Sequence, residues 1–352
     1  LEFMERDPES GIEEFKRSMG NQEDLLFLKS GEGMNATQLS AEVLRSMVQD
    51  VHQARGMQVT SAVITVPSAF GVLQCQATVE AAKLAGIQNT VLLQEPVAAA
   101  IAYGIRPGVQ DENWLVFDLG GGTFDVAVVT TKGRQLSVLS HAGDRYLGGK
   151  DVDKALVRNV ILPAIEKHFS LSGLESDTYA YRTLFQRLST LAEEAKIALT
   201  NVNSYALSVF GIGDDTEGNS IELDIEITRE DLEDCLEDAV DRCIELSRKA
   251  IAEARLDAKQ VKKVLLVGGA TQIPYIRKTI TEKLGIDLDT NTDPILAVVE
   301  GAAYYAATQE SIPVSSDYAE SDATVEVEMV ADVQPGASSG SMEGLVEPNG
   351  QV

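Results

Sequence analysis

The sequence predicts an α/β protein with two successive lobes. Helix-like and strand-like patterns alternate in the first part of the chain, where an amphipathic helix precedes an apolar strand at 59–66. A segment with strand-like patterns at about 114–143 is followed by a mostly helical segment at 151–200. These patterns indicate a first lobe at 1–112, a second lobe at 113–308 and a separate tail at 309–352.

Two segments of the first lobe predict helices. Ser40 is positioned to cap the first of these helices. The second helix lies in QEPVAAAIAYG at 94–104, where it begins at Pro96, directly after Glu95, and stops at Gly104. The apolar stripe expected on the first helix comprises Leu44, Met47, Val48 and Val51.

Residues 117–126, FDLGGGTFDV, form the most informative segment. Apolar runs flank it on both sides, which places its three glycines in the bend of a β-hairpin rather than at the strand-to-helix turn of a P-loop. Glycines let a phosphate approach backbone N–H groups, and Asp118 and Asp125 can hold hydrated Mg²⁺ or orient a water molecule. The segment therefore indicates polyphosphate chemistry, with a tight hairpin bearing solvated aspartates as the alternative.

The second lobe contains two further patterns. KKVLLVGGA at 262–270 predicts a strand that ends at a glycine pair, a second phosphate-facing or ribose-facing turn, and Pro274 then opens a helix. Apolar and acidic residues alternate at 221–227, as expected for a half-exposed strand. Thr228 and Asp231 then supply a capping-box-like start to a long acidic helix.

Together, these segments resemble the nucleotide-binding domain of the DnaK-type heat-shock chaperones, which have the actin-like, ribonuclease H-like ATPase fold. The resemblance covers about 15–307 and includes VITVPSAF at 63–70, AGDRYLGGKDVD at 142–153 and EEAKIALT at 193–200. It implies ATP or ADP and Mg²⁺ as ligands, with slow ATP hydrolysis in a chaperone cycle. Mg²⁺ would be held by Glu95, Asp118 and Asp125.

The resemblance also implies the roles of individual residues. Phosphoryl transfer depends on positioning and charge neutralisation, so a single cation and carboxylate-held Mg²⁺ suffice. Lys16 would assist cleavage of the γ-phosphate, with Thr123 contacting phosphate or water. Glu193 and Lys196 would reach the ribose hydroxyls, although on spacing alone they would form a surface salt bridge. The remaining nucleotide contacts implied are Gly120, Gly121, Gly122, Gly148, Gly149, Ile197, Thr200, Gly268, Gly269 and Gln272.

Several positions depart from the family pattern. Ile197 and Gln272 stand where the family has two arginines that enclose adenine, so weaker or altered base binding is expected. Cys75 replaces an arginine that relays the nucleotide state from Pro67, which implies reduced coupling to J-domain and nucleotide-exchange partners. The family's first phosphate hairpin is not found before Lys16, so we expect an incomplete first lobe and interpret LEFMERDPESG as a cloning remnant or a cut end.

The composition excludes some classes of binding partner. The formal net charge of −26 argues against nucleic acid or an anionic membrane as a partner, and no apolar run reaches spanning length. Three cysteines in a chain without a secretory signal favour a reduced, cytoplasmic setting. The Ser-rich, Gly-rich and acidic tail is expected to be disordered, and no peptide-binding domain is recognisable. The alternatives to a chaperone ATPase are a non-catalytic pseudo-ATPase or scaffold and, more weakly, a sugar kinase.

Overall fold

The structure, a computed structural model, describes residues 11–28, 30–104, 111–132, 135–171, 179–309 and 327–328. It is a mixed α/β protein, as the sequence predicts. The interpretation of the opening residues lies mainly outside the described residues, as does the expected disorder of the tail. Within the described part of the tail, β11 (Val327–Glu328) pairs antiparallel with β7.

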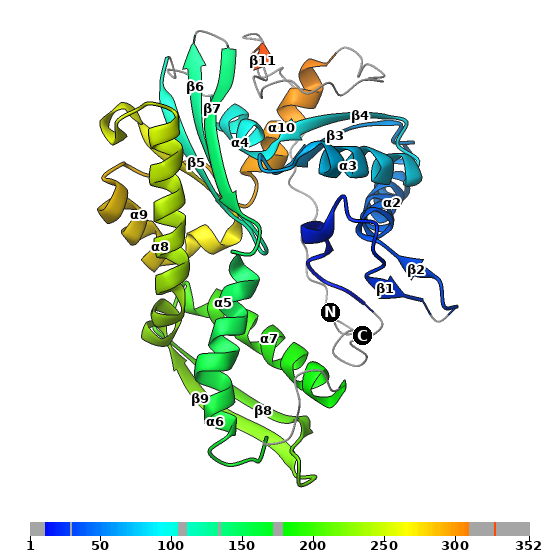
Figure 1. Cartoon of the computed structure of the whole chain (residues 1–352), viewed down its shortest axis with the longest axis vertical. Helices are drawn as coiled ribbons and strands as arrows, with labels where there is room; N and C mark the ends of the chain where they lie inside the picture. The colour runs from blue at the N-terminus through cyan, green and yellow to red at the C-terminus, as the bar shows by residue number, and fades with distance from the viewer. Residues whose placement is uncertain are drawn as a thin grey trace, which may run out of the picture.

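The largest sheet has the strand order β10-β5-β6-β7-β11 and is covered by helices on both faces (Figure 1). Strand β10 runs parallel to β5, whereas β5, β6 and β7 form an antiparallel meander. The strict alternation of side chains along β5 explains the two layers, since Leu115 and Phe117 join one core while Trp114 and Val116 join the other. The main strands of this sheet are β5 (Asn113–Leu119), β6 (Phe124–Lys132), β7 (Gln135–Asp144) and β10 (Lys263–Val267).

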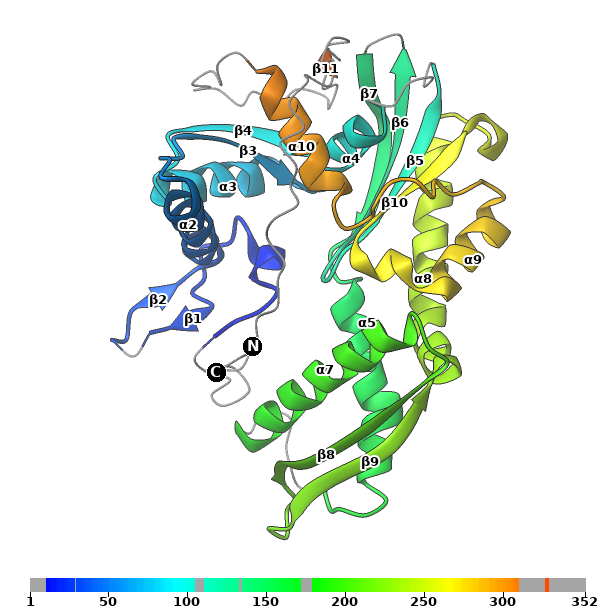
Figure 2. The same ribbon diagram turned by 180° about the vertical axis from the view of Figure 1, so that it is seen from behind.

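Each face of this sheet packs against its own set of helices. Helices α8 and α9 lie on one face with α5 and α7 beyond its end, and α4 and α10 lie on the other face (Figure 2). The helix predicted after the glycine pair begins at Pro274 as expected. The bounds are α4 (Glu95–Gly104), α5 (Gly149–Leu156), the π-helix η3 (Val157–Ile161), α6 (Leu162–Ile165), α7 (Tyr179–Leu199), α8 (Arg229–Glu253), η4 (Ala258–Gln260), η5 (Gly269–Gln272), α9 (Pro274–Leu284) and α10 (Ala297–Thr308).

The N-terminal part of the described chain forms smaller elements. Strands β3 and β4 pair in parallel as a two-stranded sheet, and helices α2 and α3 lie beside them (Figure 1). A short 3-10 turn, η2, precedes them and carries Lys16. The bounds are η2 (Phe15–Ser18), β1 (Leu26–Phe27), β2 (Gly33–Met34), α2 (Ala36–Arg55), β3 (Ser61–Val66), α3 (Val72–Leu84) and β4 (Asn89–Gln94).

Two expectations for α2 are wrong. Asn35, not Ser40, caps this helix, because Asn35 and Gln38 exchange hydrogen bonds in a reciprocal capping box. Ser40 lies inside the helix and donates to the carbonyl oxygen of Ala36. The expected apolar stripe is also only partly covered, since the side chain of Met47 is 60% exposed.

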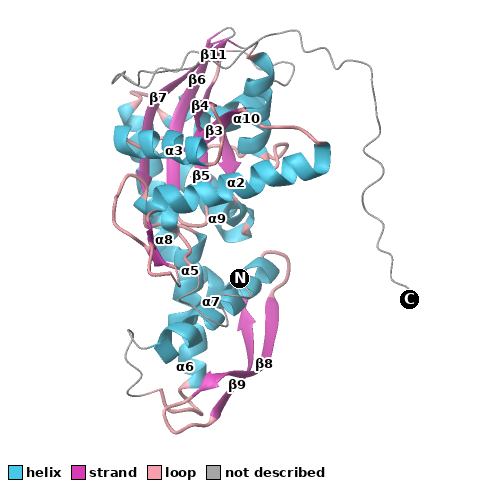
Figure 3. Ribbon diagram, turned by 90° about the vertical axis from the view of Figure 1, so that its right-hand side faces the viewer, coloured by secondary structure: helices cyan, strands magenta, loops and turns pink. Residues whose placement is uncertain are grey.

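The end of the molecule opposite α4 and α10 is a long hairpin of β8 (Ser204–Asp214) and β9 (Ser220–Thr228), next to α6 and α7 (Figure 3). Strand β9 confirms the predicted alternation: Ile221, Leu223 and Ile227 are buried while the acidic residues between them are exposed. The capping box at the start of α8 is confirmed as well, with Thr228 and Asp231 as its two members. Among the described residues, no helix is long and apolar enough to cross a membrane.

Candidate functional site

The glycine hairpin predicted from FDLGGGTFDV is present in the structure. Strands β5 and β6 pair antiparallel with Asp118 opposite Asp125, so the two carboxylates stand on neighbouring strands at the base of the turn. Thr123 closes the turn, because its carbonyl oxygen accepts from the N–H of Gly120 at 3.0 Å. The hairpin therefore holds both aspartates beside the glycine bend.

The three glycine carbonyls of this turn all have protein donors. The carbonyl of Gly120 accepts from the N–H of Gly149 at 2.9 Å, and that of Gly121 accepts from the N–H of Lys150 at 2.7 Å. The carbonyl of Gly122 accepts from Nε and Nη2 of Arg17 at 2.8 and 2.5 Å. The N–H groups of Gly121 and Gly122 have no hydrogen-bond partner among the described residues. The bend thus presents free donors and no free carbonyls, which is the polarity that an anion requires.

Two glycines outside the hairpin permit this arrangement. A Cβ added at Gly148 would lie 2.6 Å from both the carbonyl oxygen of Gly121 and the nitrogen of Gly122. Gly268 has a φ of +88°, and a Cβ there would overlap the carbonyl oxygen of Leu119. Gly148 and Gly149 at the start of α5 and Gly268 after β10 are therefore brought together around the hairpin.

Lys16 and Glu95 form an ion pair near the two aspartates. Lys16 Nζ lies 2.8 Å from Glu95 Oε1, and Glu95 is the first residue of α4. Burial alone would lower the pKa of Lys16, but attraction to Glu95, Asp118 and Asp125 outweighs it and raises the pKa above its usual value. Residues from four separate segments therefore share one electrostatic site.

The pKa values of both aspartates are raised. Burial, followed by repulsion from Glu95 and Asp125, raises the pKa of Asp118 well above its usual value. Burial and the charge of Glu95 raise the pKa of Asp125 to about 6, although Lys16 and a hydrogen bond from the backbone N–H of Ala69 oppose this shift. Such a cluster of carboxylates in one place is more stable with a cation than without one.

The carboxylate cluster has capacity for a further ligand. Asp125 Oδ1 is buried without a hydrogen-bond partner among the described residues. Among the residues that the structure describes, no three His, Cys, Asp or Glu side chains lie close enough together to ligate one metal ion directly. The arrangement therefore fits a hydrated Mg²⁺ held through water and phosphate better than a metal bound only by protein.

Glu193 and Lys196 do not pair with each other, which corrects the surface salt bridge expected from their spacing. Glu193 pairs with Lys150 at 2.9 Å, and Lys196 pairs with Asp153 at 2.7 Å. Lys196 also donates to the carbonyl oxygen of Gly149 at 3.1 Å. Asp153 is fully buried, so Lys196 neutralises it and fixes α7 against the start of α5.

The residues expected around the base are more exposed. Ile197 follows Lys196 on α7, and its side chain is 61% exposed. Thr200 donates to the carbonyl oxygen of Lys196 at 3.2 Å. Gly269 and Gln272 are the two ends of η5, and a Cβ added at Gly269 would meet no other atom within 4 Å. The cations nearby bind backbone carbonyls: Arg229 Nη2 donates to Thr200 at 3.5 Å, and Arg277 Nε donates to Thr271 in η5 at 2.9 Å.

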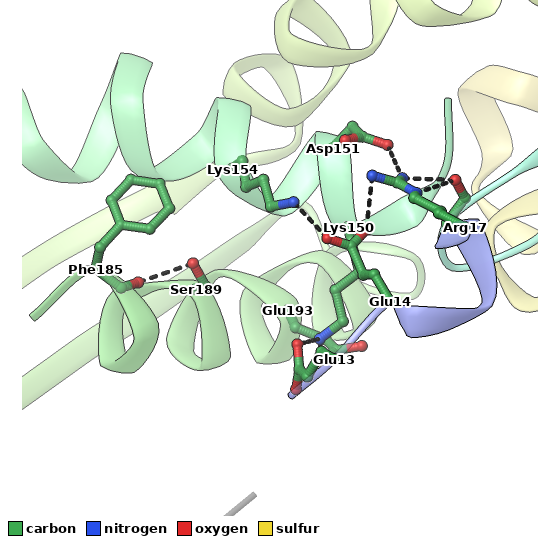
Figure 4. Close-up of polar contacts among 10 residues, drawn as sticks. Glu13, Glu14, Arg17, Lys150, Asp151, Lys154, Phe185, Ser189 and Glu193 are labelled. Carbon is green, nitrogen blue, oxygen red and sulfur yellow. Dashed lines mark hydrogen bonds and ion pairs between the residues drawn. The ribbon is translucent and has the colours of Figure 1, made fainter. Parts of the chain in front are cut away.

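Sequence reasoning did not identify several charged residues at this site. Arg17 bonds to the hairpin and to Asp151 Oδ2, the latter at 2.7 Å (Figure 4). Lys150 lies between Glu193 and Glu13. Asp151 and Lys150 belong to the segment AGDRYLGGKDVD, whose match to the family could have identified them as site residues. The contacts of Arg17 had no signal, because their partners lie far away in the sequence.

Comparison with known proteins is consistent with this geometry. The model of the family described as Hsp70 protein matches residues 6–334. The chain is 40% identical over 269 residues to a protein named "Chaperone protein dnaK" from Thalassiosira pseudonana, which covers 76% of this chain and 43% of that protein. It is 34% identical over 299 residues to "Chaperone protein DnaK" from Nitrosopumilus maritimus, covering 85% of this chain and 46% of that protein.

The match extends over most of the chain but not over most of its relatives. A third relative, "Chaperone protein DnaK" from Endomicrobium trichonymphae, is 37% identical over 301 residues, 85% of this chain and 47% of that protein. The chain spans about half the length of the curated relatives it matches. It belongs to the Hsp70 family, and this membership implies the actin-like ATPase fold.

Proposed function

We propose that this chain binds Mg-ATP and Mg-ADP and hydrolyses ATP slowly, as the nucleotide-binding part of a DnaK-type chaperone that assists protein folding. The observation that supports this best is the glycine hairpin. Its three glycine carbonyls all accept hydrogen bonds, while the N–H groups of Gly121 and Gly122 have no acceptor among the described residues. Backbone donors in such a bend suit a phosphate group. The proposal includes two lobes, at 1–112 and 113–308, with the nucleotide between them.

Mg²⁺ fits the carboxylate cluster of Glu95, Asp118 and Asp125. Burial and neighbouring negative charge raise the pKa of both aspartates, although Lys16 opposes the shift at both and Arg145 at Asp125. The unpartnered Oδ1 of Asp125 can accept from a metal-bound water. When bound, the ion would neutralise phosphate charge and supply electrostatic stabilisation to the transferring group. These three residues would hold it through water, in keeping with its preference for oxygen ligands.

The chain's own residues then assume separate roles in hydrolysis. Lys16 provides a positive charge beside the carboxylates and would stabilise negative charge that develops on the γ-phosphate. With a pKa of about 6, Asp125 is largely ionised at neutral pH and can orient a water and accept its proton. Thr123, at the end of the glycine bend, would contact phosphate or water.

The sugar and base would lie beyond the hairpin, along α7 and η5. Glu193 can reach a ribose hydroxyl only if it gives up part of its contact with Lys150, while Lys196 acts through its pair with Asp153 and through Gly149. Gly268 and Gly269 would face phosphate and ribose. Ile197, Thr200 and Gln272 would line the base with apolar and neutral groups, so base selectivity would be loose.

The partners of the whole protein are part of the same proposal. Relatives named as DnaK chaperones suggest nucleotide, J-domain proteins and nucleotide-exchange factors as partners. We expect reduced coupling to them because Cys75 departs from the family pattern. All three cysteines are free, which suits a reducing compartment such as the cytoplasm.

Calorimetric titration with Mg-ADP tests this function. Asp118→Asn keeps the side-chain shape but removes one charge of the cluster, so we expect affinity to fall by about tenfold or more. Asp224→Asn, on the exposed face of β9, is the matched control and should bind as the wild type does. Equal affinities for wild type and Asp118→Asn would refute the assignment of the hairpin as the phosphate site.

A further inference from the structure

The glycine hairpin depends on a side chain that the proposed function does not use. Arg17 follows Lys16 directly in η2, and its side chain is only 13% exposed. Its Nε and Nη2 both donate to the carbonyl oxygen of Gly122, a residue 105 positions away in the sequence. It is therefore the donor that occupies the third carbonyl of the bend.

A second group fixes the guanidinium in this position. Arg17 Nη2 also lies 2.7 Å from Asp151 Oδ2, and Arg17 Nη1 lies 3.0 Å from Glu14 Oε1 (Figure 4). Asp151 belongs to the first turn of α5, next to the backbone N–H groups of Gly149 and Lys150 that bind the other two carbonyls. The planar fork of an arginine can satisfy a carbonyl and a carboxylate at the same time, which a lysine cannot do as well.

We infer that Arg17 is a positioning residue of the phosphate site, which fixes the Gly122 carbonyl and with it the N–H of Thr123 in the same peptide plane, a donor without a hydrogen-bond partner among the described residues. The inference rests on the proposed function. The electrostatic reason is that an unbound Gly122 carbonyl could turn into the bend, where its partial negative charge would repel the phosphate. Because Lys16 precedes Arg17, the same contact also sets the distance between Lys16 and the hairpin.

Neighbouring ion pairs support the same geometry. Glu14 Oε2 lies 2.7 Å from Lys154 Nζ, and Glu13 Oε2 lies 3.5 Å from Lys150 Nζ, so the segment before Arg17 is attached to α5 twice more (Figure 4). These ion pairs are partly exposed, so each contributes little to the free energy of unfolding. Arg17 is the member of this group whose side chain contacts the glycine hairpin.

The test compares Arg17→Gln and Arg17→Lys with a matched control. Arg45→Gln is suitable because Arg45 also binds a carboxylate, that of Glu42, and a backbone carbonyl, that of Leu84, but lies on α2. Titrations with Mg-ADP and with adenosine separate the contribution of the phosphates to the binding affinity from that of the base and sugar. Loss of a charge-assisted hydrogen bond should weaken Mg-ADP about 10-fold to 100-fold in Arg17→Gln.

Adenosine affinity should change less than twofold in the same variant, and Arg17→Lys should show a smaller loss for Mg-ADP. Equal weakening of adenosine and Mg-ADP would overturn the inference, since it would show a purely structural role. Unchanged Mg-ADP affinity in Arg17→Gln would overturn it as well. The Arg45→Gln control should match the wild type with both ligands.

Amide hydrogen exchange without nucleotide distinguishes this inference from the proposed function. The N–H groups of Gly120, Gly149 and Lys150 are bonded within the hairpin assembly, so Arg17→Gln should speed their exchange about tenfold relative to Arg45→Gln. Unchanged exchange would overturn the role of Arg17 even if the wild type binds Mg-ADP. A wild type that does not bind Mg-ADP would instead overturn the proposed function, whatever the exchange rates.

Discussion

Asp125→Asn should stabilise the nucleotide-free chain at alkaline pH while it abolishes nucleotide binding. Burial and the charge of Glu95 raise the pKa of Asp125 from 3.8 to about 6. Between these values the folded chain retains a proton that the unfolded chain has lost, so the free energy of unfolding falls as pH rises through the window. Above about pH 6 the charged Asp125 lowers the free energy of unfolding by its full amount, which for a shift of about two pKa units is about 3 kcal/mol.

The asparagine variant removes this cost, because its neutral amide keeps an oxygen for the N–H of Ala69. Its advantage over wild type in the free energy of unfolding should therefore grow by roughly 1–2 kcal/mol between pH 5 and pH 8. Urea unfolding can be followed by the fluorescence of Trp114, which is the chain's single tryptophan and is fully buried in β5. Asp224→Asn should show no such dependence.

An advantage that stays constant between pH 5 and pH 8, or a variant less stable than wild type at pH 8, would refute this reasoning. The outcome matters for function because it measures the repulsion that bound Mg²⁺ would relieve. A site that is destabilising when empty and stabilised by its ligand is typical of functional carboxylate clusters.

Four further variants have expected outcomes. Gly121→Ala has open space for its methyl group and should keep the melting temperature but weaken Mg-ADP, whereas Gly148→Ala should lower the melting temperature through its contact with the hairpin. Lys196→Met leaves a buried carboxylate unpaired and should cost about 3–5 kcal/mol in urea unfolding; a loss below 1 kcal/mol would contradict the pair. Ile197→Arg with Gln272→Arg should tighten ATP more than GTP in paired titrations, and equal changes for the two nucleotides would remove these residues from the base site.

Local patterns predicted much of the fold. The glycine triplet between apolar runs indicated the β5–β6 hairpin, because glycine and alternating apolar residues act over a few positions. The capping box at Thr228 and the helix start at Pro274 were likewise readable from neighbours in the sequence. The cap of α2 was misread because Ser40 was considered without the reciprocal pair that Asn35 forms with Gln38.

Long-range contacts could not be predicted in the same way. Nothing in the spacing of Glu193 and Lys196 reveals that each binds a different residue of α5, since that depends on how α5 and α7 pack. Arg17 presents the same limit, because its role depends on the Gly122 carbonyl far along the chain. The resemblance named Gly149, whose N–H binds the hairpin, but it did not name Arg17.

The proposed function requires that phosphate binds to the N–H groups of Gly121 and Gly122. Selective ¹⁵N-glycine labelling and titration with Mg-ADP, with Mg²⁺ and adenosine as the reference, measure this directly. We predict that the amide signals of these two glycines shift with Mg-ADP and not with adenosine, because a hydrogen bond to phosphate forms only with the diphosphate. Saturable binding of Mg-ADP that leaves both signals unmoved would contradict the account.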